Sequence, residues 1–152
     1  MTTIEQKIAE LDLILPETSK PLAAYIPAVQ SGNLVFTSGQ LPMVNGSLKT
    51  TGKVGSDVSA EEAKELAQLC ALNALAAIKM VIGDLEKIKR VVKVVAFISS
   101  TPDFIDQPSV ANGASEFLGA VLGDRGVHAR SAVGVAVLPL DAPVEVELIV
   151  EI

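Results

Sequence analysis

The sequence predicts a single α+β domain in which two long helices cover one face of a sheet. Its 152 residues are close to the length of one typical domain. Hydrophobic residues make up 49% of the chain and charged residues 20%, which excludes intrinsic disorder and provides material for one core. The local patterns follow the order helix, two strands, helix, strand, helix, two strands, without an internal repeat.

Residues 1–16 are expected to form a helical extension that packs on a core of residues 20–152. Thr2 and Glu5 have the spacing of a capping box. Apolar residues follow at helical intervals: Ile4, Ile8 and Leu11. The helix should end near residues 13–16.

Two tightly joined strands are predicted next. Residues 25–29 and 34–39 have the composition of strands, and residues 31–33 (Ser-Gly-Asn) form a turn between them, which indicates a hairpin. Residues 43–55 are rich in Gly, Thr and Asn and predict a loop with one short edge strand.

The first long helix is expected over residues 59–82. Ser59 and Glu62 form a second capping box, and an apolar stripe runs from there to a stop at Gly83. The opposite side of this helix is also apolar, so it should lie along the sheet and be partly covered elsewhere. A second helical stripe begins at Val110 and ends around Gly123.

Three further strands complete the predicted sheet. Residues 91–98 form an almost continuous β-branched run, which is typical of a central strand buried on both faces. Residues 129–138 and 144–152 are expected to pair as an antiparallel hairpin. In the last strand, apolar residues occupy one face, and Glu145, Glu147 and Glu151 occupy the other.

Composition excludes several function classes. The net charge of -6 gives no attraction to nucleic acid or anionic lipid, so neither is an expected partner. A single cysteine, Cys70, indicates a buried thiol in a reducing, cytoplasmic environment. A single histidine, His128, cannot build a metal site that needs two imidazoles. No signal peptide, membrane span or nucleotide-binding glycine motif is recognised, so we expect a soluble protein without cofactor or metal.

Arg130 is the most informative charged residue. It opens an otherwise uncharged strand, and the side chains that share its face are small: Ala132, Gly134 and Ala136. A planar guanidinium suits a carboxylate held by two hydrogen bonds, and the small neighbours leave room for one. The alternatives are a structural ion pair with a strand glutamate or an interface contact.

The acidic residues of the last strand have two interpretations. Glu145 and Glu147 can place or deprotonate a water molecule, although alternating acids usually form the solvated face of a strand. Whether Arg130 and Glu145 share a face depends on strand register, which the pattern leaves open.

Two weaker patterns favour structural roles. Ser131 and His128 lie in one segment without a nucleophile-elbow motif, which disfavours a catalytic triad. The basic residues between Lys87 and Lys93 are few, adjoin Glu86 and lack interleaved aromatic residues, so a solvated turn explains them better than a nucleic-acid patch.

Three ordered motifs resemble the RidA family, also called YjgF/YER057c/UK114 or L-PSP. They are residues 32–40 with Pro42, residues 84–95, and residues 129–139 with 144–147. The resemblance covers about residues 20–152. It implies a chorismate-mutase-like fold and a homotrimer with ligand clefts between the subunits.

The resemblance also implies a reaction and a set of site residues. The reaction is hydrolysis of reactive enamines and imines, such as 2-aminoacrylate, to 2-keto acids and ammonia. Arg130 matches the arginine that binds the substrate carboxylate, and Glu145 matches the acid that positions the attacking water. The substrate-binding positions implied by the resemblance are Tyr25, Ser38, Gly39, Asn112 and Ala132.

The extra N-terminal helix and residues 112–115 indicate a longer RidA-like subgroup, and two departures from the family pattern indicate that its pocket is its own. Ala132 stands where a cysteine is common, and residues 23–27 replace a Gly-Pro-Tyr-Ser-Gln entry. The alternative to an enzyme is a non-catalytic trimer that binds a small carboxylate. An endoribonuclease is disfavoured by the net charge of -6 and by an aromatic content of 3%.

Overall fold

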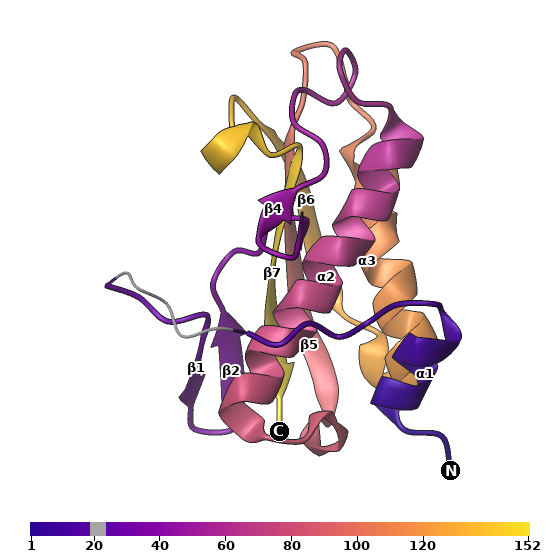
Figure 1. The fold of residues 1–152 in the computed structure, drawn as a ribbon, viewed down its shortest axis with the longest axis vertical. Helices are drawn as coiled ribbons and strands as arrows, with labels where there is room; N and C mark the ends of the chain where they lie inside the picture. The colour runs from indigo at the N-terminus through magenta and orange to yellow at the C-terminus, as the bar shows by residue number, and fades with distance from the viewer. Residues whose placement is uncertain (19–23) are drawn as a thin grey trace.

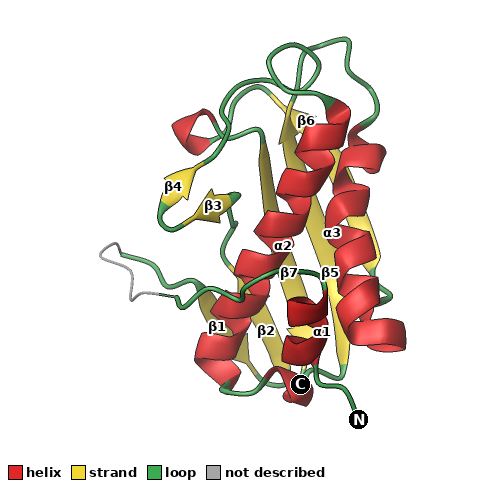
Figure 2. Ribbon diagram, turned by 45° about the vertical axis from the view of Figure 1, so that its right-hand side comes forward, coloured by secondary structure: helices red, strands yellow, loops and turns green. Residues whose placement is uncertain are grey.

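A five-stranded sheet carries α1, α2 and α3 on one of its faces (Figures 1 and 2). The computed structural model describes residues 1–18 and 24–152. The elements are α1 (Ile4–Glu10), β1 (Ala28–Ser31), β2 (Leu34–Thr37), β3 (Met43–Val44), β4 (Ser47–Leu48), α2 (Ala60–Ile82), β5 (Arg90–Ser99), α3 (Gln107–Leu122), β6 (Ala129–Val135) and β7 (Val144–Glu151). Short 3-10 turns occur at Leu85–Lys87, Gly123–Gly126 and Pro139–Asp141.

The strand order is β1-β2-β7-β5-β6. The hairpin predicted for β1 and β2 is confirmed, whereas the hairpin predicted for β6 and β7 is wrong, because β5 lies between them. β5, α3 and β6 form a β-α-β unit, in which the crossover helix brings the two strands together in parallel. The link from β6 to β7 must therefore pass over the end of β5, which places β6 at the edge of the sheet.

Both long helices begin and end near the predicted residues. The Ser59 hydroxyl accepts a hydrogen bond from the Glu62 backbone at the start of α2, and Gly83 ends that helix with a positive φ of 80°. Most of α2 is buried against the sheet and α3. By length and composition α2 alone among the described helices could cross a membrane, a property that buried core helices share.

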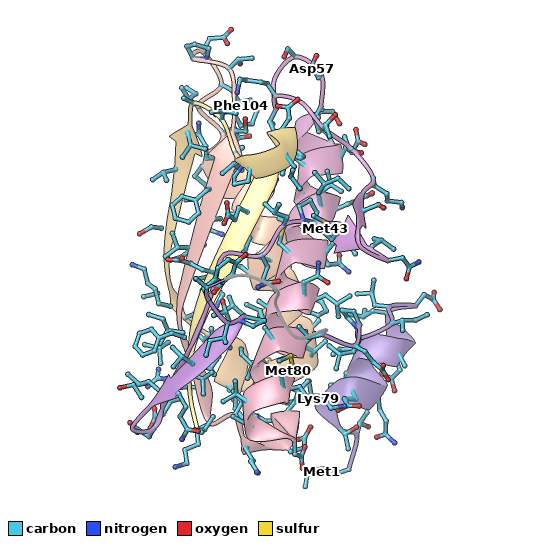
Figure 3. The ribbon with its side chains drawn as sticks, turned by 60° about the vertical axis from the view of Figure 1, so that its left-hand side comes forward. Met1, Met43, Asp57, Lys79, Met80 and Phe104 are labelled. Carbon is cyan, nitrogen blue, oxygen red and sulfur yellow. The ribbon has the colours of Figure 1, made fainter. Side chains whose placement is uncertain are left out.

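The two faces of the sheet have different surroundings. On the helix face, alternate residues of β7 are buried in the core: Val144, Val146, Leu148 and Val150. We call the other side the open face, because no helix of the described residues covers it (Figure 3). The prediction that residues 91–98 are buried on both sides is wrong for the single chain, since Val95 and Phe97 on the open face are only half-buried.

The N-terminal helix is shorter than predicted and starts one residue later. Thr3, not Thr2, caps it in a reciprocal capping box with Gln6, and α1 ends at Glu10. Asp12 adopts a left-handed φ of 59°, which is incompatible with a continuing helix. Ile4 and Ile8 are buried in the main core, so the extension packs on the domain as expected.

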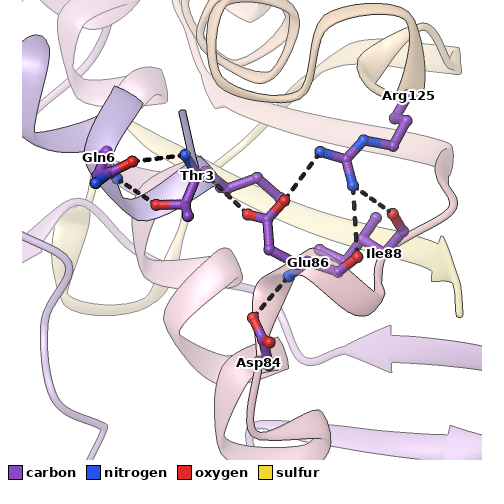
Figure 4. A network of polar contacts seen from close by, with 7 residues as sticks. Thr3, Gln6, Asp84, Glu86, Ile88 and Arg125 are labelled. Carbon is purple, nitrogen blue, oxygen red and sulfur yellow. Dashed lines mark hydrogen bonds and ion pairs between the residues drawn. The ribbon is translucent and has the colours of Figure 1, made fainter. Parts of the chain in front are cut away.

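A polar network holds this helix to the turn before β5 (Figure 4). The Glu86 carboxylate accepts a 2.6 Å hydrogen bond from the backbone N–H of Ile4, at the positive end of α1. It also pairs with Arg125, at 3.4 Å, and Arg125 donates to the backbone oxygen of Ile88 at 3.1 Å. One carboxylate therefore connects α1, the Leu85–Lys87 turn and the turn that follows α3.

The helices α2 and α3 approach each other closely at Gly113. A Cβ atom at this position would lie 1.8 Å from the backbone oxygen of Lys64 on α2. We expect Gly113→Ala to lower the free energy of unfolding by about 1–3 kcal/mol, because the clash is with backbone that moves only if the helices separate. The measurement is urea unfolding followed by circular dichroism.

Gly119→Ala on the same helix is the matched control. A Cβ atom at Gly119 meets nothing within 4 Å, so alanine should raise stability by about 0.5–1 kcal/mol through its higher helix propensity. Equal effects of the two substitutions would contradict the packing explanation.

Candidate functional site

Arg130 lies on the helix face of the edge strand β6, half-buried beside α3. In the sheet register it is opposite Val94 of β5, which is buried in the core beneath the helices. Its Nη1 atom donates to the Asn112 Oδ1 atom at 2.8 Å and to the Ser115 Oγ atom at 3.1 Å. Asn112 and Ser115 are three residues apart on α3, so one helix face presents both acceptors.

The Arg130 charge is held in place without being neutralised. Asn112 and Ser115 are neutral, and no carboxylate of the described residues forms an ion pair with Arg130. Both hydrogens of Nη1 are used, while Nε and Nη2 have no hydrogen-bond partner in residues 1–18 and 24–152. The Nε–Nη2 edge is therefore available for a carboxylate in the bidentate geometry that arginine favours.

Glu145 lies on the opposite side of the sheet from Arg130. It is opposite Phe97 in the β5–β7 register, and both side chains are on the open face. Arg130 is on the helix face, two strands away. The two side chains therefore cannot contact one small molecule within a single chain, which resolves the register question that the sequence leaves open.

The Glu145 carboxylate lies directly over the backbone of Gly39. A Cβ atom at Gly39 would be 1.9 Å from the Oε1 atom of Glu145. The bridge between Gln40 and Val146 brings this segment against β7, with hydrogen bonds of 2.8 and 3.0 Å. Partial burial, and next the negative charge of Glu147, raise the pKa of Glu145 above its ordinary value.

Ser38 and Tyr25 lie near Gly39 but have different surroundings. The Ser38 hydroxyl donates to the backbone oxygen of Ile26 at 2.7 Å, and its N–H donates to the oxygen of Pro27 at 2.7 Å. Ser38 thus holds the segment that carries Tyr25, which precedes β1 rather than forming part of it and is 64% exposed. A cavity of about 770 Å³ beside α2 is lined by both Tyr25 and Gly39.

The space predicted next to Arg130 is partly occupied. Ala132 shares the helix face with Arg130, but a Cβ atom at Gly134 would lie 2.8 Å from the Ser100 hydroxyl and 2.9 Å from the Gln107 amide nitrogen. Glycine at position 134 therefore accommodates the start of α3. The room that the sequence predicts beside this strand is therefore filled at Gly134 by Ser100 and Gln107.

Sequence reasoning missed the role of Ser115. Its position three residues after Asn112 is the only local signal that it faces Arg130 as well. The serine considered with His128 was Ser131, which is on the open face, whereas the imidazole is 2.9 Å from the Ser115 hydroxyl. The Ser131–His128 pair is therefore excluded by the strand register.

Gly39→Ala should displace the Glu145 carboxylate while preserving the fold. The new Cβ atom would meet the flexible end of Glu145, which can rotate away, so we expect the thermal midpoint to change by about 4 °C or less. Displacement of the carboxylate should slow any reaction that uses it about as much as removal of Glu145, by about 10²-fold or more. Adding Gly39→Ala to Glu145→Ala should have no further effect, and an additive loss would show that Gly39 acts independently of the carboxylate.

The chain is similar to proteins of one family over nearly its whole length. A family model described as "YjgF/chorismate mutase-like, putative endoribonuclease" matches residues 5–152. Protein TCP17 of Trypanosoma cruzi is 39% identical over 150 residues, which are 98% of this chain and 94% of that protein. The 2-iminobutanoate/2-iminopropanoate deaminase of Escherichia coli strain K12 is 33% identical over 130 residues, 84% of this chain and 87% of the enzyme.

A solved structure agrees with these matches. The crystal structure of protein Atu1372, of unknown function, from Agrobacterium tumefaciens has a TM-score of 0.92 and 48% identity to this chain. The likeness covers 99% of this chain and 92% of the Atu1372 chain. The family match and this likeness confirm the predicted fold class, a chorismate-mutase-like mixed sheet with two long helices on one face.

Proposed function

Because the chain belongs to the YjgF/RidA family, we propose that it hydrolyses small reactive enamines and imines of the 2-aminoacrylate type to 2-keto acids and ammonia. The observation that carries the proposal is that the Arg130 charge is held by neutral groups and is not neutralised by a carboxylate among the described residues. The guanidinium is half-buried and has an edge with no partner among the described residues. The family relatives named as imine deaminases support the same reaction class.

The proposed site combines two chains of a homotrimer. Arg130, Asn112 and Ala132 of one subunit would face Glu145 and Gly39 of the next, with Ser38 holding the Tyr25 segment at the rim. Two features support this arrangement: Arg130 and Glu145 are on opposite faces of their own sheet, and the open face carries apolar side chains among its acidic ones without a covering layer of described residues. Half-buried or exposed apolar residues occupy that face: Val29, Leu34, Phe36, Val95, Phe97, Val133 and Ile149.

The proposed mechanism uses positioning and one base. Arg130 holds the substrate carboxylate, so that the imine carbon lies at a fixed distance from a water molecule on Glu145. The protonated imine carbon is already electrophilic, and Glu145 takes a proton from the water as its oxygen bonds to that carbon. The protonated Glu145 then returns this proton to the nitrogen, and the carbon–nitrogen bond breaks as the hydroxyl oxygen forms the carbonyl and releases its own proton, which leaves ammonia and the 2-keto acid. A raised carboxyl pKa suits this role, because it makes the carboxylate a stronger base.

The direct test is turnover by the wild-type protein. A pyridoxal-phosphate-dependent dehydratase acting on serine generates 2-aminoacrylate in the assay, and pyruvate release is followed with and without this protein. We expect faster pyruvate formation than the uncatalysed hydrolysis and a trimer by light scattering. Saturable pyruvate binding without any acceleration would instead favour a non-catalytic carboxylate-binding trimer.

The remaining partners follow from charge and chemistry. We propose a cytoplasmic protein that takes a small carboxylate and other copies of itself as partners, without nucleic acid or membrane. The net charge of -6 opposes binding to phosphate backbones, which disfavours the endoribonuclease function in the family description. RNA cleavage that follows the protein through successive purification steps and disappears in Arg130→Ala would contradict this.

A further inference from the structure

We propose that Ser115 and His128 are positioning residues that determine which edge of the Arg130 guanidinium faces the substrate carboxylate. This inference rests on the function proposed above. Three contacts carry it: His128 Nδ1 to the backbone oxygen of Gly126 at 2.6 Å, His128 Nε2 to Ser115 Oγ at 2.9 Å, and Arg130 Nη1 to Ser115 Oγ at 3.1 Å.

The direction of every hydrogen in this chain of bonds follows from its ends. A backbone carbonyl oxygen only accepts, so the Nδ1 atom of His128 must carry the ring proton. In the neutral ring Nε2 then has a lone pair and no proton, and Ser115 must donate its single hydroxyl proton to it. The Ser115 oxygen is left as an acceptor toward Arg130, whose guanidinium only donates.

Both ends of this chain of hydrogen bonds, which we call the His128–Ser115 relay, are attached to α3. Ser115 belongs to this helix, and Gly126 is buried against it, because a Cβ atom at Gly126 would lie 2.4 Å from the backbone oxygen of Leu118. The Gly126 carbonyl therefore has little freedom, and it fixes the imidazole in turn. An imidazole held from behind orients the serine oxygen, much as second partners orient the ligands of metal sites.

The consequence for Arg130 is geometric. The relay directs an acceptor at one hydrogen of Nη1, and Asn112 takes the other. Rotation of the guanidinium would break both bonds, so the Nε–Nη2 edge is held in one orientation. Without the relay, Asn112 alone holds Nη1, and the guanidinium can turn about that single bond and offer other edges.

The first measurement is the tautomer of His128. It is the single histidine of the sequence, so its ring nitrogens give one set of signals in ¹⁵N spectra of the full-length protein. At pH 8.5, for the neutral ring, we expect the Nδ1–H form that the Gly126 carbonyl requires. The Nε2–H form would overturn the proposal, and this reading does not depend on whether any variant folds.

The second measurement is a double-mutant cycle on binding of 2-oxobutanoate, followed by titration calorimetry. Ser115→Ala removes a hydrogen bond to Arg130, and His128→Ala removes the group that orients the Ser115 hydroxyl, so each should weaken binding about three- to tenfold. Ser115→Thr keeps a hydroxyl at this position and should bind 2-oxobutanoate almost as tightly as the wild-type protein. In an Arg130→Lys background, which lacks the planar fork, the same substitutions should change binding less than about twofold. Ser109→Ala, on the same helix with its hydroxyl on Asp106, is the control.

The outcomes separate this inference from the proposed function. Unchanged binding in Ser115→Ala and His128→Ala, or equal losses in the arginine and lysine backgrounds, would overturn the positioning role and leave the proposed function standing. A wild-type protein that neither binds 2-oxobutanoate nor accelerates 2-aminoacrylate hydrolysis would overturn the proposed function itself.

Discussion

Arg130→Ala is expected to lower kcat/KM for 2-aminoacrylate by about 10²–10³-fold, because it removes a charged, doubly hydrogen-bonding partner of the substrate carboxylate. Most of the loss should be in KM and in the affinity for pyruvate, since the carboxylate does not take part in bond breaking. Arg130→Lys keeps the charge but not the planar pair of donors, so its kcat/KM should lie between those of the wild-type protein and Arg130→Ala. The measurement is steady-state pyruvate release combined with pyruvate titration.

Arg90→Ala is the matched control for this prediction. Arg90 is an exposed arginine at the start of β5, opposite Glu151 rather than the residues of the proposed site, and its removal makes the same change in net charge. We expect its kcat/KM to stay near the wild-type value. Equal losses in both variants would mean that the Arg130 effect reflects overall charge rather than a binding site.

Glu145→Gln is expected to lower kcat by about 10²–10⁴-fold, because the amide cannot accept the proton of the attacking water. The substitution keeps the size of the side chain over Gly39, so pyruvate binding through Arg130 should remain close to the wild-type value. Single-turnover measurements of 2-aminoacrylate decay separate these two quantities. Retained turnover would assign the water to another group.

The same substitution has a predicted effect on stability. Burial and then Glu147 raise the pKa of Glu145 above its ordinary value of 4.5, so the folded chain binds this proton more tightly than the unfolded chain. The charged carboxylate therefore costs stability, and that cost appears as pH rises from about 4.5 through the raised value and persists above it.

Glu145→Gln should accordingly raise the free energy of unfolding at pH 7, by less than about 1 kcal/mol because solvent screens a half-buried charge. Below pH 4.5 the advantage should disappear, since the carboxyl is then protonated in both states. Urea unfolding of both proteins at pH 4 and pH 7 gives the comparison, in which all other carboxylates cancel. A stabilisation that is equal at both pH values would refute the electrostatic cause.

Local patterns in the sequence were sufficient for most individual elements. The capping serine and terminal glycine marked α2, a helical stripe marked α3, and the alternation of valine, leucine and glutamate in β7 assigned its two faces correctly. These features depend on residues only a few positions apart, where side-chain period and capping chemistry act directly. The start of α1 was displaced by one residue because Thr2 and Thr3 both fit a capping pattern.

The candidate site was predicted only in part. Arg130 stood out because it opens a strand of small and apolar residues, Glu145 was one of two acidic candidates of the last strand, and the family resemblance selected Glu145 and added Gly39 and Asn112 as expectations. Neither the pattern nor the resemblance indicated that Ser115 shares Arg130 with Asn112, or that His128 lies behind Ser115. Those contacts join α3 to β6 across a turn, and nothing in the local spacing of either element specifies which residues meet.

The sequence by itself determined the approximate position of most helices and strands, which side of each is apolar, and that one arginine stands free of acidic neighbours along the chain. Only the tertiary structure decided that β5 separates β6 from β7, and that Arg130 and Glu145 therefore face opposite sides of the sheet. Strand order and register arise from contacts between distant segments, and the crossover helix α3 determines them here by placing β6 parallel to β5. A periodic pattern records which way a side chain points from its own strand, but not which strand lies beside it.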